Sequence, residues 1–208
     1  MNAAPWIAGA AAGAVALASQ TVSAQVIDVS GVVAASAERT GANFSASVEY
    51  AHMGGTAGQL TIDLTNDSMA SVGGFLTAIA FRAIPTDSTV DITLASADPS
   101  VFLDTGAVRG GGFGEFDGGA GLWGAFLGGG SPRGGLGIGE SGRFVFDITT
   151  PNAALLSTES FIGTADQPGL LVRFRGQEFG GSDMVPVPAP ASLALLGLGG
   201  LMASRRRR

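Results

Sequence analysis

Five stretches of this chain alternate between hydrophobic and polar residues with a period of two. In the first stretch, Phe44, Ala46, Val48 and Tyr50 alternate with serine and glutamate. The other four stretches have their hydrophobic positions at Leu60, Ile62 and Leu64; Val90, Ile92 and Leu94; Phe144, Phe146 and Ile148; and Leu170, Val172 and Phe174. This period, in residues such as Val, Ile, Thr and Phe, predicts β-strands that bury one face.

A further stretch, Phe75 to Ile84, is apolar at nearly every position, which predicts a central strand buried on both faces. Turn-forming residues such as Gly54-Gly55 and Asp98-Pro99 separate the stretches. No sustained helical period is present, although residues 152–160 could form a short helix. Because parallel strands need crossover helices, the pattern predicts an all-β fold, an antiparallel β-sandwich.

Residues 106–139, called here the Gly-rich segment, break this alternation because nearly half of them are glycine. We expect a long loop whose glycines allow left-handed backbone and close approaches. Its aromatic residues indicate that it packs on the sandwich. They also suggest an alternative, a carbohydrate-binding module that stacks sugars on Phe113, Phe116, Trp123 and Phe126. Buried rings would favour a core role, whereas a solvent-facing row of rings would favour binding.

Composition narrows the functional classes. The chain has 208 residues with 46% hydrophobic and 13% charged residues, about half the usual charged share of ~25%, which suits one globular domain rather than disorder. Cysteine is absent, which excludes disulfides, thiol catalysis and cysteine-ligated metals. The net charge is -6 and every basic residue is arginine. An acidic body without a basic patch argues against nucleic-acid binding.

The sequence has few residues that could form a catalytic site, so we expect no enzyme activity, no cofactor and no metal site. His52 is the single histidine, and no Gly-x-Ser-x-Gly nucleophile motif occurs. A secreted hydrolase, the least favoured alternative, would need paired acids in a cleft. The available pairs are Glu115 with Asp117 and Glu178 with Asp183. The run from Gly111 to Asp117 matches a calcium-binding nonapeptide only weakly and occurs once.

The first 24 residues have the features of a secretory signal peptide. Residues 6–18 are apolar, and the small residues Val22, Ser23 and Ala24 follow at the position that signal peptidase requires. Cleavage is expected between Ala24 and Gln25. The first residues carry no Lys or Arg, which departs from the usual pattern.

The last 24 residues have three parts. The first is the motif Val185-Pro186-Val187-Pro188-Ala189, whose prolines predict an extended, exposed segment. An apolar run follows, and no charged residue stands between Val185 and Ser204, a length of about the 20 residues that a membrane-spanning helix needs. Arg205, Arg206, Arg207 and Arg208 then close the chain and would hold that end in the cytoplasm.

This three-part arrangement resembles the PEP-CTERM sorting signal of Gram-negative bacteria. The family's usual glutamate between the prolines is Val187 here, which is closer to the VPLPA-type variant. The resemblance implies recognition by an exosortase, a membrane cysteine transpeptidase, with the helix held transiently in the inner membrane. A permanent, uncleaved tail anchor is the alternative.

We therefore expect three parts: a signal peptide over 1–24, a β-sandwich surface domain over 25–184 and a sorting signal over 185–208. The expected function is that of an exported, non-enzymatic cell-surface or extracellular-matrix protein, with extracellular polysaccharide as a candidate partner.

Overall fold

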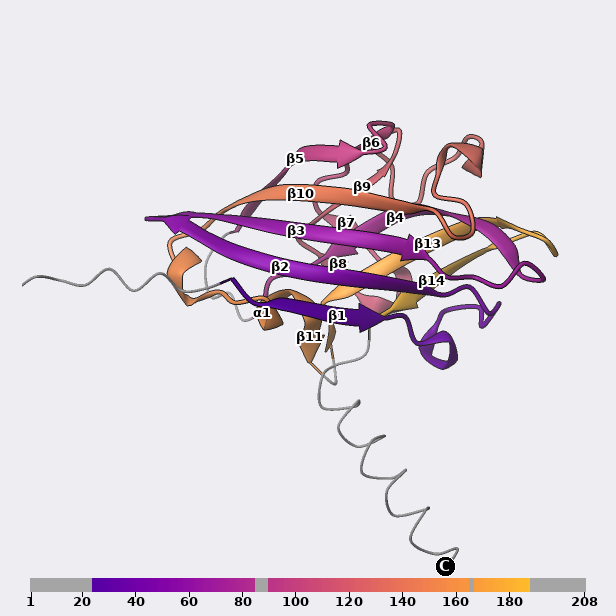
Figure 1. The fold of residues 1–208 in the computed structure, drawn as a ribbon, viewed down its shortest axis with the longest axis horizontal. Helices are drawn as coiled ribbons and strands as arrows, with labels where there is room; N and C mark the ends of the chain where they lie inside the picture. The colour runs from indigo at the N-terminus through magenta and orange to yellow at the C-terminus, as the bar shows by residue number, and fades with distance from the viewer. Residues whose placement is uncertain (1–23, 85–89, 165–166, 188–208) are drawn as a thin grey trace, which may run out of the picture.

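The computed structural model of the protein describes residues 24–84, 90–164 and 167–187. This part of the chain, called here the folded body, is built mainly from β-strands in two five-stranded antiparallel sheets. In Figure 1 the first sheet lies in front of the second, and the strands of the two sheets cross at an angle. The predicted all-β antiparallel class is confirmed, in a sandwich-like arrangement.

The first sheet contains, in spatial order, β1 (Val26–Ser30), β2 (Phe44–Gly54), β3 (Ala57–Asn66), β10 (Ser141–Thr149) and β5 (Asp91–Asp98). The second sheet contains β14 (Ser182–Pro186), β13 (Leu170–Gln177), β4 (Gly73–Phe81), β9 (Gly118–Leu122) and β6 (Phe102–Asp104). Two short ribbons complete the strands: β7 (Val108–Arg109) with β8 (Glu115–Phe116), and β11 (Gly163–Thr164) with β12 (Gln167–Pro168).

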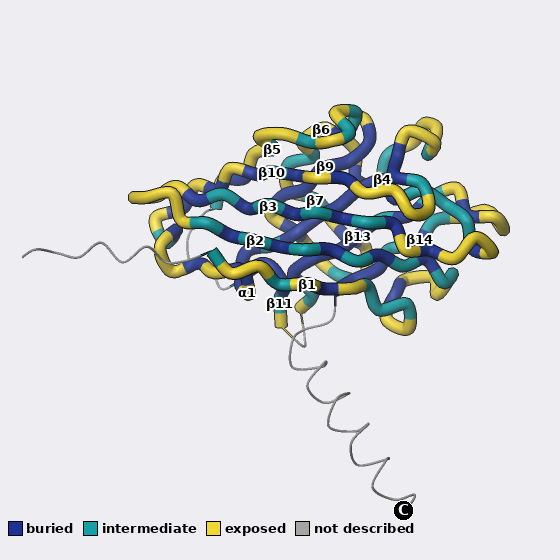
Figure 2. The backbone as a smooth tube through the Cα atoms, in the orientation of Figure 1, coloured by how far each residue is buried: buried dark blue, intermediate teal, exposed yellow. Residues whose placement is uncertain are grey.

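The alternating stretches form strands as predicted. In β2 as far as Tyr50, and in β3, every second residue is buried, and the residues between them form the outer face of the first sheet (Figure 2). The register fixes this arrangement because Val48 lies opposite Ile62, and Tyr50 lies opposite Leu60. A slip of one residue would turn all of these side chains to solvent.

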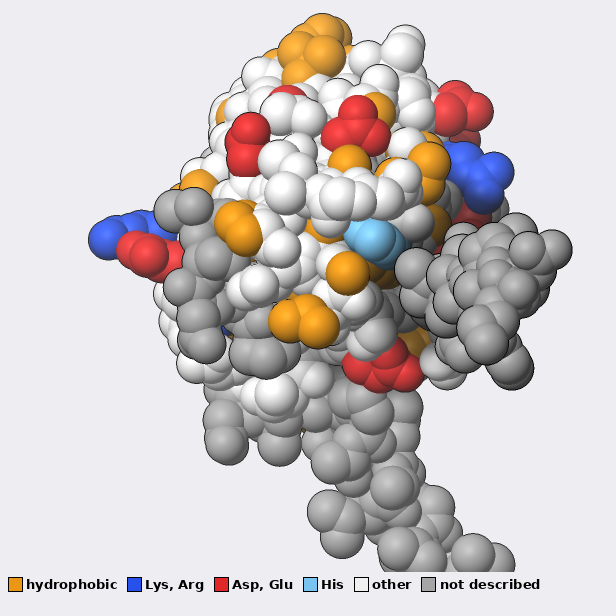
Figure 3. All heavy atoms as spheres, turned by 90° about the vertical axis from the view of Figure 1, so that its left-hand side faces the viewer, with side chains coloured by type: hydrophobic (Ala, Val, Ile, Leu, Met, Phe, Trp, Pro, Cys, Tyr) orange, Lys and Arg blue, Asp and Glu red, His pale blue; other side chains and the backbone are white. Residues whose placement is uncertain are grey.

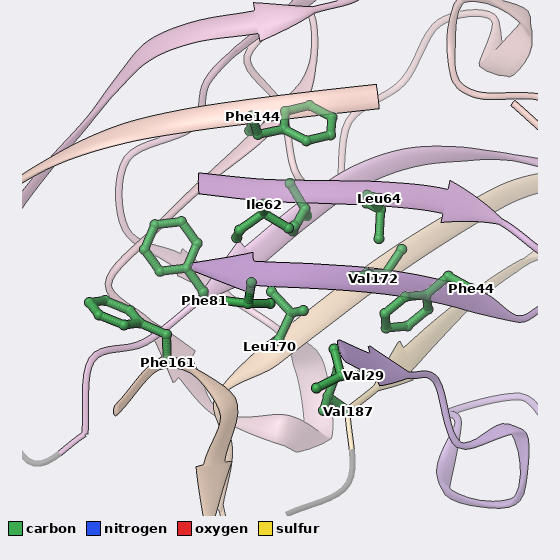
Figure 4. Packing of buried hydrophobic residues seen from close by; sticks show 14 of the residues in the cluster. Val29, Phe44, Ile62, Leu64, Phe81, Phe144, Phe161, Leu170, Val172 and Val187 are labelled. Carbon is green, nitrogen blue, oxygen red and sulfur yellow. The ribbon is translucent and has the colours of Figure 1, made fainter. Parts of the chain in front are cut away.

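The main core lies between the two sheets and contains their buried apolar side chains (Figure 4). Aromatic rings join the layers edge to face: Phe81 of β4 meets Phe146 of β10 with ring centroids 4.6 Å apart. Phe102 of β6 and Phe144 of β10 form a second such pair, with ring centroids 5.1 Å apart. Such pairs contribute about 0.5–1.5 kcal/mol each beyond the area that they bury.

The apolar stretch after residue 75 forms β4, which lies between β13 and β9, as predicted for a central strand. Residues 76–81 are all buried. Alternate residues face opposite ways, so Ile79 and Phe81 enter the main core while Ala78 and Ala80 belong to a second, smaller cluster. The second sheet is therefore covered on both faces.

The Gly-rich segment is not the single long loop that the sequence predicts. Its residues Gly118–Leu122 form β9, an interior strand between β4 and β6. The glycines leave space that side chains would occupy. A Cβ on Gly119 would lie 2.3 Å from the carbonyl oxygen of Ile79, and one on Gly118 would lie 2.5 Å from the Ile92 side chain. Close approach of neighbouring backbone requires glycine in this strand.

Helical structure in the folded body is short. The 3₁₀ turns are η1 (Val33–Ala35), η2 (Gly111–Phe113), η3 (Pro132–Gly134) and η4 (Ala153–Leu155), and the α-helical turn is α1 (Glu159–Ile162). The short helix expected over residues 152–160 is thus divided between η4 and the start of α1. No helix among the described residues has the length and apolar character to cross a membrane. The predicted transmembrane helix lies outside those residues.

Candidate functional site

The four aromatic residues predicted to stack on sugars do not form a common surface. Phe116 and Phe126 are buried, with exposed fractions of 1% and 4%, and Phe113 is partly buried. Trp123 is exposed to 64%. The four rings therefore do not form the solvent-facing row that would favour sugar binding, because two of them cover the outer face of the second sheet.

These buried rings form the second cluster, which we call the outer cluster. Phe116 and Phe126 pack there with Leu171 of β13 and with the two alanines of β4. Small alanine side chains leave room for the rings to approach the sheet. The Gly-rich segment therefore folds back over the sheet and packs on it, as its aromatic content predicts.

Arginine side chains fasten the Gly-rich segment to the sheet. Arg82 donates from Nη2 to the carbonyl of Phe113 at 2.7 Å, and its guanidinium lies 4.2 Å from the centre of the Phe116 ring. Arg173 donates to the carbonyl of Phe126 at 2.9 Å. Arg175 donates to two glycine carbonyls, at 3.1 and 3.0 Å. The planar guanidinium presents several donors in fixed directions, which suits binding to successive carbonyls.

Burial lowers the pKa of Arg82, while the charge of nearby Asp117 acts in the opposite direction. Burial also lowers the pKa of Arg173, and the neighbouring positive charge of Arg175 adds to this effect. Arginine keeps its proton under such shifts. These cations therefore remain charged and serve as structural donors at this face.

Trp123 stands in the turn that follows β9 and has a left-handed backbone, with φ of 59°. Its turn is closed by the amide of Gly124, which donates to the carbonyl of Gly121 at 3.0 Å. A bulky residue is rarely found in this conformation, and such strain is concentrated at functional sites. Among the non-glycine residues that the structure describes, Arg39 alone shares a positive φ. Trp123 is thus an exposed aromatic residue held at a conformational cost.

The first pair of candidate hydrolase acids is engaged in local contacts. Glu115 forms an exposed ion pair with Arg109 at 2.8 Å. Asp117 accepts a hydrogen bond from the amide of Ala83 at 2.9 Å, which joins the Gly-rich segment to the end of β4. These contacts give both acids structural partners.

Asp183, from the second pair, is a buried carboxylate at the centre of a hydrogen-bond network. Its exposed fraction is 1%. Oδ1 accepts from the amides of Glu38 at 2.9 Å and Met184 at 2.8 Å. Oδ2 accepts from the hydroxyl of Ser36 at 3.0 Å, and from the amide at 3.0 Å and the hydroxyl at 2.7 Å of Thr40. The carboxylate therefore pins the β1–β2 connection to β14.

Burial by itself would raise the pKa of Asp183. The hydrogen bonds from Glu38, Thr40 and Ser36 outweigh this effect and lower the pKa below its ordinary value. Glu178, the other member of this pair, is exposed beyond the end of β13. Asp183 is thus an ionised structural anchor. Sequence reasoning missed this role because the β1–β2 connection that it binds lies about 145 residues earlier.

His52 lies on the surface near the end of β2, where its Nε2 is 3.2 Å from the carbonyl oxygen of Gly55. Figure 3 shows this histidine, in pale blue, on the surface at that end of the molecule, with acidic side chains above and below it. Within residues 24–84, 90–164 and 167–187, no three acidic or histidine side chains are grouped to hold a metal ion. In the run from Gly111 to Asp117, the chain forms η2 and then β8.

The start of the predicted sorting motif belongs to the folded body. Val185 and Pro186 are the last residues of β14, and Val187 follows directly. All three are buried. The expectation of an extended conformation is confirmed for β14, whereas the expectation of exposure is wrong for these residues. They fill the edge of the core where the sheets meet.

The remaining predicted sorting residues, Pro188, Ala189 and Arg205 to Arg208, lie outside the described residues, as does the signal peptide before Ala24. The predicted cleavage site lies at the start of the folded body. The carbonyl of Gln25 accepts a hydrogen bond from the hydroxyl of Thr158 at 2.6 Å, and β1 begins one residue later.

Comparison of the chain with protein-family models, with curated proteins and with solved structures finds no match.

Proposed function

We propose that this protein is an exported, non-enzymatic cell-surface or extracellular-matrix protein whose C-terminal segment is a sorting signal for an exosortase-type transpeptidase. The observation that carries the proposal is the order of features at the end of the chain. The last strand, β14, ends at Pro186. Beyond it come further prolines, an uncharged apolar run through Ser204 and the four closing arginines. This order suits a body outside the membrane and an anchor with its arginines inside.

The position of the first strand supports export. β1 begins at Val26, so cleavage between Ala24 and Gln25 leaves each strand of the folded body whole. The charge of the chain also suits this setting, because a net charge of -6 favours solubility outside the cell.

The non-enzymatic role is supported by the structural contacts of the buried and partly buried charged side chains. Asp183 binds backbone amides and hydroxyls of the β1–β2 connection. Arg82 and Arg173 bind carbonyls of the Gly-rich segment. These groups join distant parts of the chain, as expected of a protein selected for a durable body.

The proposal is tested by protease treatment of intact host cells, followed by detection of the folded body. We expect the body to be degraded in intact cells because the proposed location at the cell surface exposes it to the added protease. Replacement of the four closing arginines by serine should impair retention and processing of the tail. The matched control replaces the exposed arginines Arg39, Arg109 and Arg133 by serine and should behave as wild type. A body that stays protected until the cells are lysed contradicts the proposal.

Carbohydrate binding remains a second candidate because of one observation, the strained and exposed Trp123. A flat indole can stack on the apolar face of a sugar ring. A glycan array with the wild-type protein should give signals that Trp123→Ala abolishes. Leu127→Ala, at another exposed position of the same segment, should leave those signals intact. An array without signals, or signals that survive Trp123→Ala, refutes this candidate.

A further inference from the structure

Val185, Pro186 and Val187 are the last residues that the structure describes, and their main chain forms hydrogen bonds toward both sides. Toward β13, Val185 pairs with Val172 in the antiparallel register, and the amide of Val187 donates to the carbonyl of Leu170 at 3.0 Å. Toward the opposite side, the carbonyl of Pro186 accepts from the amide of Val32 at 3.1 Å. The proline itself has no amide that would need a partner. This edge of the second sheet is thus covered through Val187.

The side chains of the same residues are part of the main core. The exposed fractions of Val185 and Val187 are 0% and 1%. Both valines belong to the same buried cluster as Val29 of β1 (Figure 4). The packing is close at Gly31, where an added Cβ would lie 2.7 Å from Cγ1 of Val185. The first three residues of the predicted sorting motif are therefore held by both hydrogen bonds and burial.

We propose that the folded body sets the position at which the C-terminal segment is removed, so that the bond that is cut lies after Val187. This inference rests on the proposed function. Recognition of an extended peptide uses its free main-chain donors and acceptors. The paired main chain of Val185, the carbonyl of Pro186 and the amide of Val187 are already engaged within the protein. A processing enzyme therefore finds its first accessible bond beyond them.

The chemical step is an acyl transfer. The carbonyl carbon at the cut loses its bond to nitrogen and gains one to the nucleophile of the enzyme, and the departing segment leaves with a protonated new amino group. Water or an amine then displaces the enzyme. Because the cut follows Val187, the mature protein keeps β14 whole. A cut before Val185 would remove two core valines and uncover the β13 residues beneath them.

The test begins with the purified full-length chain and proteinase K, a protease of broad specificity that stays active in urea. Fragment masses then show where cuts occur in the native chain and in the chain unfolded by urea. We expect the bond between Met184 and Val185 to be cut at least about tenfold more slowly in the native chain, because a cut there requires local opening of β14, whereas bonds after Val187 should be cut at similar rates in both. Native fragments that end at Met184 and form as fast as in the unfolded chain overturn the inference.

A variant checks that burial causes this protection. Val187→Asp places a charge at the end of the strand and should increase cutting before Val185 by about tenfold. Leu155→Asp, at a position exposed to 80%, is the matched control and should not change the cutting pattern. If Val187→Asp fails to fold, Val187→Ala provides the milder test. Equal cutting of wild type and a folded Val187 variant overturns the inference.

A second measurement identifies the last residue of the protein isolated from its native host. Termini at Val187 or later support the inference, whereas termini from Asp183 to Pro186 overturn it. If the chain is recovered uncut, the proposed function fails. The proteinase K experiment then still decides whether the body protects the chain through Val187, so the two failures are distinguishable.

Discussion

Replacement of Asp183 by asparagine removes the charge from the most heavily hydrogen-bonded carboxylate described in the folded body while keeping its shape. If the asparagine oxygen occupies the Oδ1 position, it still accepts from the amides of Glu38 and Met184. The new amide nitrogen then faces the amide of Thr40, which is a donor. The hydroxyls of Ser36 and Thr40 can rotate and accept. One backbone donor therefore loses its acceptor.

The magnitude follows from two contributions. A buried donor left without a partner costs about 1–3 kcal/mol. The retained hydrogen bonds lose the assistance of the charge, and charge-assisted bonds are roughly twice as strong as neutral ones. We expect Asp183→Asn to lower the free energy of unfolding by about 3 kcal/mol at neutral pH. A shift of this size would be a large part of the ~5–15 kcal/mol that stabilises a typical domain.

The effect should depend on pH in a defined direction. Burial opposes ionisation of Asp183, but the hydrogen bonds prevail and lower its pKa in the folded protein. A carboxylate with a depressed folded pKa contributes stability above its unfolded pKa, which is about 3.9. That contribution is lost as the pH falls through the lower folded value. The gap between wild type and Asp183→Asn should therefore be widest at neutral pH and narrow in acid.

The assay is urea unfolding of the full-length chain, with the midpoint and slope compared between proteins. Asp147→Asn is the matched control because it makes the same change at an exposed position whose contact, to Gln59, is also exposed. The control should stay within about 0.5 kcal/mol of wild type. If Asp183→Asn also stays within that range at neutral pH, the carboxylate does not anchor the β1–β2 connection, and the reasoning is refuted.

Three further substitutions test the account of the Gly-rich segment. In urea unfolding, Gly119→Ala should lower the free energy of unfolding by about 2–3 kcal/mol because the new Cβ would meet the backbone of β4, whereas Gly112→Ala, with open space around it, should be nearly neutral. Phe116→Ala should lower the free energy of unfolding by about 3–5 kcal/mol because it leaves a cavity in the outer cluster. In the same thermal melts, Leu127→Ala should change stability little because Leu127 is exposed. Trp123→Gly should raise stability by about 1 kcal/mol, since glycine relieves the left-handed backbone, and a loss of stability would show that the indole supports the fold.

The sequence predicts most of the two sheets because one physical rule governs them. In β2, β3 and β10 one face meets the core and the other meets water, so the alternation of residue types marks both the strand and its buried face. The central strand β4 is recognisable for a related reason, since it is buried on both faces. These elements owe their pattern to local side-chain chemistry.

Two strands escape this rule. In β9 the close approach of neighbouring residues leaves room only for glycine, and a glycine-rich sequence predicts a loop rather than a strand. In β14 the prolines suggest an exposed segment, yet at a sheet edge Pro186 needs no donor, and its carbonyl is bonded to Val32. The role of Asp183 is likewise invisible, because its partners are distant in sequence. Contacts between distant segments, rather than local periodicity, decide these features.

The central claim is that the protein is exported and processed at both ends. It is tested most directly by the intact mass of the protein from its native host, with and without the sorting enzyme. The account predicts a chain that starts at Gln25, ends after Val187 but before the apolar run, and keeps its tail when the enzyme is absent. A chain that retains Arg205 to Arg208 in both hosts contradicts it.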